Sequence, residues 1–217
     1  MSDVPKPAEP GSRAGSAKAG TISRLIQAAR AEFAAEGLAG SRIDVIARKA
    51  GVTKQLVYHY YHSKEELFSA VLDDASCSTM LKLVEQDFSH LPPTEALRQF
   101  LYEIFEQYRV DPLLGPLARE GLRFHEKHHS AHNRFIDLTP SLTTALERIL
   151  QRGIRTGDFR DQVDPKALMA MAALLMTGGF TNRHSLSVIL DWDPTTPDGM
   201  ERWRETAADL VLATLRA

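Results

Sequence analysis

The sequence predicts an all-helical protein. Apolar residues recur at intervals of three and four along most of the 217 residues, which is the spacing of one helix face. Glycine and proline, together with Ser, Thr or Asp in front of the periodic stretches, mark where such helices end and begin. No stretch alternates apolar and polar residues as a strand would. We expect a small helical unit over residues 21–67 and a larger helical bundle over residues 68–217.

Composition narrows the class of protein. An apolar content of 43 % and a charged content of 25 % are ordinary for a globular chain, and no run of about 18 apolar residues would span a membrane. Residues 1–20 are rich in Pro, Gly, Ser and Ala and lack the apolar core of a secretion signal, so we expect a disordered tail. The single cysteine, Cys77, fits a cytoplasmic protein; it is either a small packing residue or a redox-sensitive thiol.

The first helix is predicted from about Thr21 to Glu36, with Gly37 ending it. Ser41 is predicted to cap a second helix, in which Asp44 completes a weak capping box. The apolar face of that second helix is spaced at i, i+3, i+4 and i+7 and consists of Ile43, Ile46, Ala47 and Ala50.

A tight turn and a short third helix follow. Gly51 supplies the backbone freedom for the turn, and Thr53 is placed to cap a helix that begins at Lys54. Val57 and Tyr61 are expected to face inward, which leaves the polar side chains outward. Two helices joined by a tight turn form the outline of a helix-turn-helix, and amide, ammonium, phenol and imidazole groups can reach base edges or phosphates in a major groove. The outward side chains of this helix are Lys54, Gln55, Tyr58 and His59.

These stretches resemble the DNA-binding domain of TetR-type bacterial regulators. The resemblance lies in AARAEFAAEGL, IDVIARKAGVT and LVYHYYHSKEEL, in that order and without gaps, between Ile22 and Leu67. Gln55 and Leu56 depart from the usual pattern, and the operator sequence is therefore left open. The resemblance implies double-stranded operator DNA as a partner, a homodimer, and a C-terminal bundle that binds a small effector. The residues expected to contact DNA are Arg42, Thr53, Lys54, Gln55, Tyr58, His59 and Lys64.

The charge distribution supports an N-terminal contact with DNA. Up to Lys64 there are ten Lys or Arg against five Asp or Glu, a net charge of +5, so the remaining residues carry −7 of the total of −2. Lys6, Arg13 and Lys18 give the tail charge for a minor-groove contact, unless it is an inert leader. Lys64 follows Ser63, the cap of a fourth helix, and opposes the helix dipole, which favours a nearby phosphate over simple exposure.

The larger bundle is predicted from periodicity alone. The fourth helix is expected to end near Asp87 or Phe88, and Pro92 and Pro93 precede the fifth. Thr139 with Pro140, and Asp164 with Pro165, give start signals for two later helices. The further helices are expected over about 94–110, 113–135, 141–156, 165–182 and 200–216, with a loop at 191–199.

Two of these helices carry stripes that suit a dimer seam or, alternatively, an intramolecular core. The stripes consist of Trp203, Ala207, Leu210, Val211 and Thr214 on the last helix, and Leu168, Ala172, Leu175, Met176, Gly178 and Gly179 on the helix from Asp164. A largely apolar or aromatic effector is expected in a pocket between the middle helices. Its candidate lining residues are Phe100, Tyr102, Phe105, Tyr108, Phe124, His125, His128, Phe135, Met169, Met176 and Phe180.

A histidine cluster is the remaining chemical feature. His125, His128, His129 and His132 would share one face of a continuous helix, and pairs four residues apart can chelate a metal. The weak metal candidates are His125, His129 and His132; effector or proton sensing and plain surface are the alternatives.

No catalytic motif was found, so the chain is not expected to be an enzyme or to need a cofactor. The sequence therefore predicts a ligand-responsive, DNA-binding repressor of the cytoplasm. The alternative is a helical metal-dependent enzyme or metal sensor that uses the residues from His125 to His132.

Overall fold

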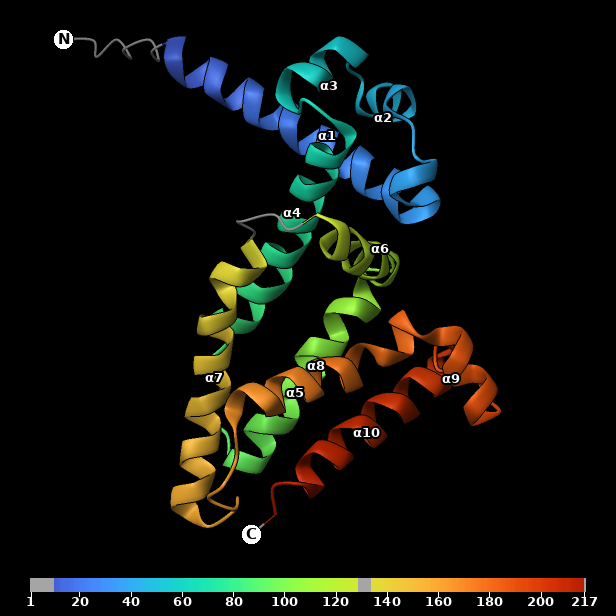
Figure 1. Cartoon of the computed structure of the whole chain (residues 1–217). Helices are drawn as coiled ribbons and strands as arrows, with labels where there is room; N and C mark the ends of the chain where they lie inside the picture. Colours follow the sequence, from blue (N-terminus) through green and yellow to red (C-terminus); the bar gives the residue numbers. More distant parts are fainter. Residues whose placement is uncertain (1–9, 129–133, 217) are drawn as a thin grey trace, which may run out of the picture. The chain divides into compact units, whose positions relative to one another are not determined.

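The protein is described by a computed structural model covering residues 10–128 and 134–216, with side chains described from residue 17 onward (Figure 1). The described residues form helices joined by short connections, and apart from one isolated bridge between Phe159 and Arg216 they contain no strand pairing, which confirms the predicted fold class. The helices are α1 (Pro10–Gly40), α2 (Ile43–Ala50), α3 (Lys54–Tyr60), α4 (Lys64–Glu85), α5 (Pro93–Val110), α6 (Leu114–Lys127), α7 (Arg134–Thr156), α8 (Pro165–Thr181), α9 (Arg183–Leu190) and α10 (Pro197–Ala213). None of these described helices is long and apolar enough to cross a membrane.

The chain divides into two compact units, Met1–Val71 and Leu72–Ala217. The boundary falls inside α4, four residues beyond the position at which the sequence suggested a division. Each unit therefore contains one part of the same helix.

The N-terminal unit packs α1, α2, α3 and the start of α4 around a small apolar core. Phe33 of α1 and Phe68 of α4 are fully buried, and their rings meet edge to face with centroids 4.9 Å apart. Val57 of α3 is buried, as predicted. The buried carboxylate of Glu32 on α1 accepts a hydrogen bond from the partly exposed ammonium of Lys49 on α2 at 2.7 Å. These contacts hold the two short helices α2 and α3 on the longer α1.

Helix α1 differs from the prediction at its start. It begins at Pro10, so residues 10–20 are helical, and the expectation of a disordered tail is wrong for them; residues 1–9 lie outside the described part. The hydroxyl of Thr21 donates to the carbonyl of Ala17 within the helix. Residues 10–20 extend α1 because adding residues to a formed helix costs less free energy than nucleating a new one. At the other end Gly37 has a φ of 67°, and the regular helix ends there as predicted.

The predicted cap of α2 is also wrong. Arg42 occupies the N-cap position, while Ser41 turns away and donates its hydroxyl to the carbonyl of Leu38 at 3.0 Å. Asp44 pairs with the guanidinium of Arg42 at 3.0 Å instead of completing a capping box. Ser41 thus closes the end of α1 and not the start of α2.

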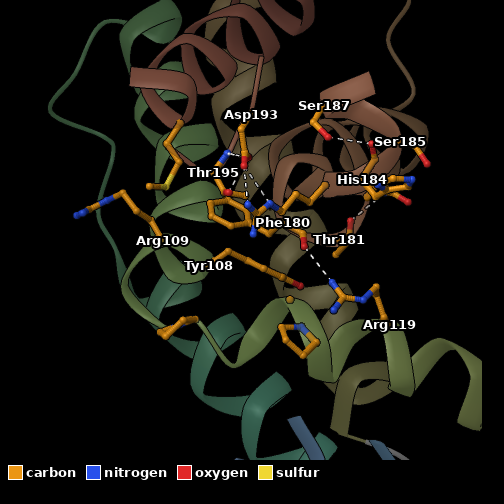
Figure 2. Close-up of a pocket in the computed structure, with 16 residues that line it drawn as sticks. Tyr108, Arg109, Arg119, Phe180, Thr181, His184, Ser185, Ser187, Asp193 and Thr195 are labelled. Atoms are coloured by element: carbon orange, nitrogen blue, oxygen red, sulfur yellow. Dashed lines mark hydrogen bonds and ion pairs between the residues drawn. The ribbon is translucent and has the colours of Figure 1, made fainter. Parts of the chain in front are cut away.

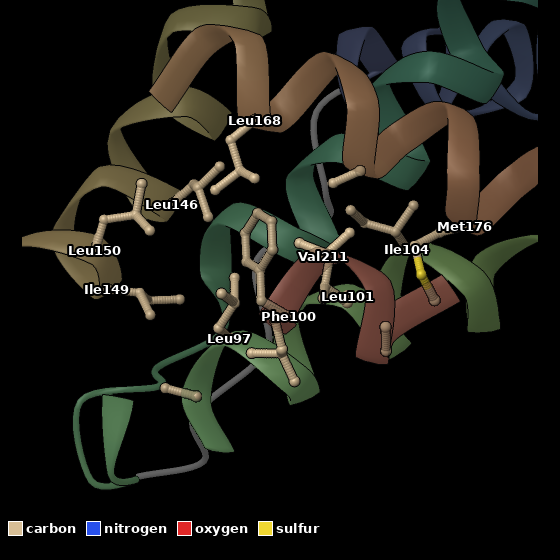
Figure 3. Close-up of a cluster of buried hydrophobic side chains, with 14 of the residues drawn as sticks. Leu97, Phe100, Leu101, Ile104, Leu146, Ile149, Leu150, Leu168, Met176 and Val211 are labelled. Carbon is tan, nitrogen blue, oxygen red and sulfur yellow. The ribbon is translucent and has the colours of Figure 1, made fainter. Parts of the chain in front are cut away.

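The C-terminal unit has its core between α5, α7, α8 and α10 (Figure 3). Phe100 of α5 and Met176 of α8 are fully buried, and Leu146 of α7 and Val211 of α10 pack into the same cluster. Arg152 of α7 anchors the connection between α4 and α5, because its guanidinium donates to three backbone carbonyls of that connection. Those carbonyls belong to Phe88, Ser89 and Leu91.

Several helix boundaries in the C-terminal unit differ from the prediction. Helix α7 begins at Arg134 with Pro140 inside it, and the hydroxyl of Thr139 bonds to the carbonyl of Phe135 four residues back, so Thr139 does not cap a helix. Helix α9 was not predicted, and α10 begins at Pro197, where Thr196 caps it by accepting from the N–H of Gly199. The predicted cap Asp164 accepts from two N–H groups of α8, as expected.

Candidate DNA-reading helix and effector cavity

Helix α3 presents a polar surface, and its first turn is closed by a cap. The hydroxyl oxygen of Thr53 accepts from the N–H of Leu56 at 3.2 Å, which confirms the predicted cap. Gly51 has a φ of 68° and ends α2 in the left-handed conformation that the turn requires. The hydroxyl proton of Thr53 is left available, since the cap uses only its oxygen.

Five of the seven side chains expected to contact DNA are exposed on or just before α3; Arg42 is exposed at the N-cap of α2, where it pairs with Asp44, and Lys64 is half-buried. Lys54, Gln55, Tyr58 and His59 are exposed on α3, and Thr53 is exposed before it. Tyr58 has the largest side chain of this group and is 42 % exposed. The Lys54 ammonium lies 5.9 Å from the centroid of its ring. Tyr61, expected to be inward, is half-buried and ends the helix.

Lys64 has a structural partner that the sequence did not reveal. Its ammonium donates to the carbonyls of Ala39 at 3.2 Å and Ser41 at 3.1 Å, where α1 ends. A cation in the first turn of α4 is thus explained without a phosphate, because it stabilises carbonyl groups at the end of another helix. One of its three N–H bonds is still available to a phosphate.

The cap of α4 was predicted correctly. The hydroxyl oxygen of Ser63 accepts from the N–H of Glu66 at 3.0 Å. The carboxylate of Glu66 accepts in turn from the backbone N–H of His62 at 2.9 Å.

A cavity of about 860 Å³ opens in the C-terminal unit (Figure 2). Its walls come from the end of α5, the start of α6, the end of α8, α9, and the connection before α10. The lining residues are Tyr108, Arg109, Pro112, Gly115, Pro116, Arg119, Phe180, Thr181, Asn182, Arg183, His184, Ser185, Ser187, Asp193, Thr195 and Met200. Its volume lies in the range of cavities that hold small ligands, and its walls mix rings with charged and polar groups.

Close packing and an ion pair shape this cavity. At Gly115 an added Cβ would come 3.1 Å from the carbonyl of Phe180, so a larger residue there would crowd the end of α8. Asp193 accepts from the hydroxyl and backbone N–H of Thr195 and pairs with Arg183. The hydrogen bonds from Thr195 have the largest effect and the bond from Arg183 a smaller one, and together they lower the pKa of Asp193 to about 2. Asp193 is therefore ionised at neutral pH and fixes the connection before α10.

Only two of the eleven predicted pocket residues, Tyr108 and Phe180, line this cavity. The apolar rings and methionines at helical spacing serve mostly as packing: Phe100, Phe105 and Met176 are fully buried in the core, Met169 packs against it, and Phe124 is buried in α6. Tyr102 instead donates its hydroxyl to Glu205 of α10, and Phe135 is exposed on α7. The sequence missed the polar lining around residues 181–195, because no periodicity distinguishes a loop that faces a cavity from one that faces solvent.

The continuous histidine face does not form. Helix α6 ends at Lys127, and His128 is its extended C-cap, with the imidazole stacked on Phe124 at a centroid distance of 4.4 Å. His125 remains on the last turn of α6, half-buried beside the same ring. His129 and His132 lie outside the described residues, and the described residues contain no group of three possible metal ligands.

Most residues of the two predicted dimer stripes pack in the core of the subunit, whereas Leu210 of the last helix is exposed. Ala172, Met176 and Val211 are buried, and Trp203 packs on Gly178 with its N–H donated to the carbonyl of Leu175 at 2.9 Å. Helices α8, α9 and α10 also expose apolar side chains. This exposed apolar surface consists of Met171 and Leu174 on α8, Val188 and Ile189 on α9, and Leu210 on α10.

The two units correspond to two family models. The model described as "Bacterial regulatory proteins, tetR family" matches residues 25–71, and the one described as "Tetracyclin repressor-like, C-terminal domain" matches residues 93–211. The chain belongs to the tetR family. The family consists of transcriptional regulators and not of enzymes, and its DNA-binding helix-turn-helix corresponds here to α2 and α3. The family resemblance inferred from the sequence is thereby confirmed.

Two relatives of this tetR-family regulator are named as transcriptional repressors. This chain is 30 % identical over 198 residues to the HTH-type transcriptional repressor NicS of Pseudomonas putida, and the alignment covers 90 % of this chain and 92 % of NicS. It is 55 % identical over 105 residues to the HTH-type transcriptional repressor SCO4008 of Streptomyces coelicolor, covering 48 % and 51 %. The solved structure of FadR from Bacillus subtilis in complex with stearoyl-CoA shares the fold, with a TM-score of 0.63, 18 % identity and coverage of 88 % and 98 %.

Proposed function

We propose that this tetR-family regulator is a homodimeric repressor that leaves a palindromic operator when a small molecule occupies the cavity of its C-terminal unit. The observation that carries the DNA-binding part is the capped helix α3, which exposes Lys54, Gln55, Tyr58 and His59 together. Those groups suit base edges and phosphates in a major groove. The repressor names of NicS and SCO4008 support repression over activation.

The dimer brings two copies of α3 to one operator. The exposed apolar surface on α8, α9 and α10 supports a two-fold contact, because Leu174 and Ile189 are each 73 % exposed and water-contacting apolar area of this kind favours association. In such a dimer the two recognition helices enter successive major grooves roughly 34 Å apart. The protein then works where the operator is, in the cytoplasm of a bacterium.

Release requires a path from the cavity to α4. Helix α6 supplies one: its first half lines the cavity at Pro116 and Arg119, and further along Gly121 lies against Leu72 of α4. An added Cβ at Gly121 would come 3.2 Å from Leu72, so the two helices have little room to move independently. A ligand that shifts α6 would therefore shift α4, provided that it binds the two dimer states with different affinity.

DNA binding is tested by fluorescence anisotropy of the purified protein on labelled DNA from upstream of its own gene, with scrambled DNA as the control. We expect selective binding that weakens as salt rises. Equal binding to both duplexes, in the absence and presence of candidate ligands, would argue against an operator at that position.

The dimer is tested by sedimentation of two variants with the same chemical change. Leu174→Glu places a charge on the exposed apolar surface, whereas Leu122→Glu does so at a leucine of α6 that is 67 % exposed elsewhere in the same unit. We expect Leu174→Glu to sediment as a monomer and to lose DNA affinity, and Leu122→Glu to remain dimeric. Two variants that both stay dimeric would place the interface elsewhere.

A further inference from the structure

The arginines that line the cavity differ in their partners. Arg109 pairs with the carboxylate of Glu106 at 2.6 Å, and Arg183 pairs with Asp193. Arg119 instead donates to a backbone carbonyl, that of Phe180 at 3.1 Å. Among the described residues no carboxylate balances the charge of Arg119. A guanidinium has five N–H donors, so most of them remain available on the cavity side of α6.

Tyr108 adds a second donor to the same region. In Figure 2 the hydroxyl of Tyr108 and the guanidinium of Arg119 point toward one another from α5 and α6. Among the described residues the Tyr108 hydroxyl has no hydrogen-bond partner, although its side chain is largely enclosed. Burial raises the pKa of Tyr108, and the phenol therefore stays protonated and can donate at neutral pH.

The apolar side of the cavity lies next to these donors. The ring of Phe180 lies 5.7 Å from that of Tyr108, tilted by 33°, and is supported from behind by Phe105 at 4.9 Å. Pro112 and Pro116 line the cavity from the same end. A ring or short chain packed there would leave its polar end beside Arg119 and Tyr108.

We infer that the cavity takes a small organic carboxylate, whose anionic group is held by Arg119 and Tyr108 and whose apolar body packs on Phe180. A guanidinium and a phenol together match the geometry of a carboxylate, and within the described part of the chain neither of them pairs with an acidic side chain. This inference rests on the proposed function, in which the cavity holds the effector. It replaces a purely apolar effector by one that carries a negative charge.

The test compares four carboxylates with their neutral amides: benzoate, 2-naphthoate, indole-3-acetate and octanoate. Binding to the full chain is measured by isothermal titration at ligand concentrations up to about 1 mM, which detects dissociation constants up to about 1 mM. We expect at least one carboxylate to bind about tenfold or more tightly than its amide, since a hydrogen bond to a charged group contributes that much. Failure of all four carboxylates to bind, or equal binding of acid and amide, would overturn the inference.

Variants assign the charge to its residue. Arg119→Met should weaken carboxylate binding by about tenfold to a hundredfold, and Tyr108→Phe by about fivefold. Arg123→Met is the matched control, because that arginine of α6 pairs with Glu120 and does not line the cavity, and the change should affect binding little. Unchanged thermal melting of Arg119→Met would show that the variant is folded; unchanged carboxylate affinity in it would refute the role of Arg119.

DNA release separates this inference from the proposed function. A carboxylate that binds through Arg119 but leaves anisotropy on upstream DNA unchanged would support the ligand class and contradict the effector role. If a neutral ligand released the protein from upstream DNA, and released the Arg119→Met variant equally well, the result would support the repressor function and overturn the inference of a carboxylate ligand.

Discussion

Replacing Lys64 by methionine separates two roles of this side chain. Methionine keeps the length of the stem and removes the ammonium that donates to the carbonyls of Ala39 and Ser41. The Ser41 contact is part-buried and the Ala39 contact is exposed, so we expect a loss of about 1–2 kcal/mol in the stability of the N-terminal unit.

The third N–H of Lys64 gives the second expected effect. If it contacts one phosphate in each subunit of the dimer, the slope of log K against log salt falls by about 1.8, since each phosphate contributes about 0.9. Between roughly 50 and 200 mM salt the natural protein should then lose about 12-fold more affinity than the variant.

Both effects are measured on one preparation. Thermal melting of the variant reports the hydrogen bonds of Lys64 to the end of α1, and anisotropy over a salt series reports the phosphate contact. Lys82→Met, at the other end of α4, removes the same charge from an exposed position and is the control. A lowered melting temperature with an unchanged salt slope would refute the phosphate contact, and an unchanged melting temperature would refute the stabilising role of those hydrogen bonds.

Three further outcomes are expected. Lys54→Ala or Gln55→Ala should reduce the preference for upstream over scrambled DNA; an equal loss on both duplexes would remove them as base readers. Because its pKa is lowered to about 2, Asp193 should contribute stability that is complete above about pH 4 and is lost as the pH falls toward 2; acid melting of Asp193→Asn should lack that component, and identical acid profiles would contradict it. Gly153→Ala should destabilise the C-terminal unit by about 1–3 kcal/mol in denaturant unfolding, since the new Cβ would lie 2.0 Å from the ring of Phe159; unchanged stability would show that the ring moves freely.

Local signals predicted the elements that depend on local chemistry. Thr53 and Asp164 cap their helices as expected, because a side-chain oxygen beside the first N–H groups has few competing partners. Ser41 carries the same signal and does not cap, because α2 begins one residue later and Arg42 occupies its N-cap position.

The DNA-reading surface was more predictable than the cavity. The side of α3 opposite Val57 must be exposed once Val57 is buried, and this follows from helix periodicity alone. The cavity is assembled from the ends of several helices and the connection at Asp193, and its position depends on how those helices cross. Phe100 and Met176 illustrate the failure, because an apolar residue at helical spacing serves a core and a pocket equally well.

The three carbonyls held by Arg152 have a mechanical consequence for α4. They anchor the connection that follows the C-terminal end of α4, so in the proposed release a rigid α4 would rotate about that end. A helix of 22 residues is about 33 Å long, and a tilt of about 5° therefore carries Lys64 through about 3 Å. In a two-fold dimer with opposed tilts, the separation between the two first turns changes by twice that distance. Under the proposed mechanism, a small tilt at the anchored end would thus produce a mismatch between the two recognition helices and the helical repeat of DNA.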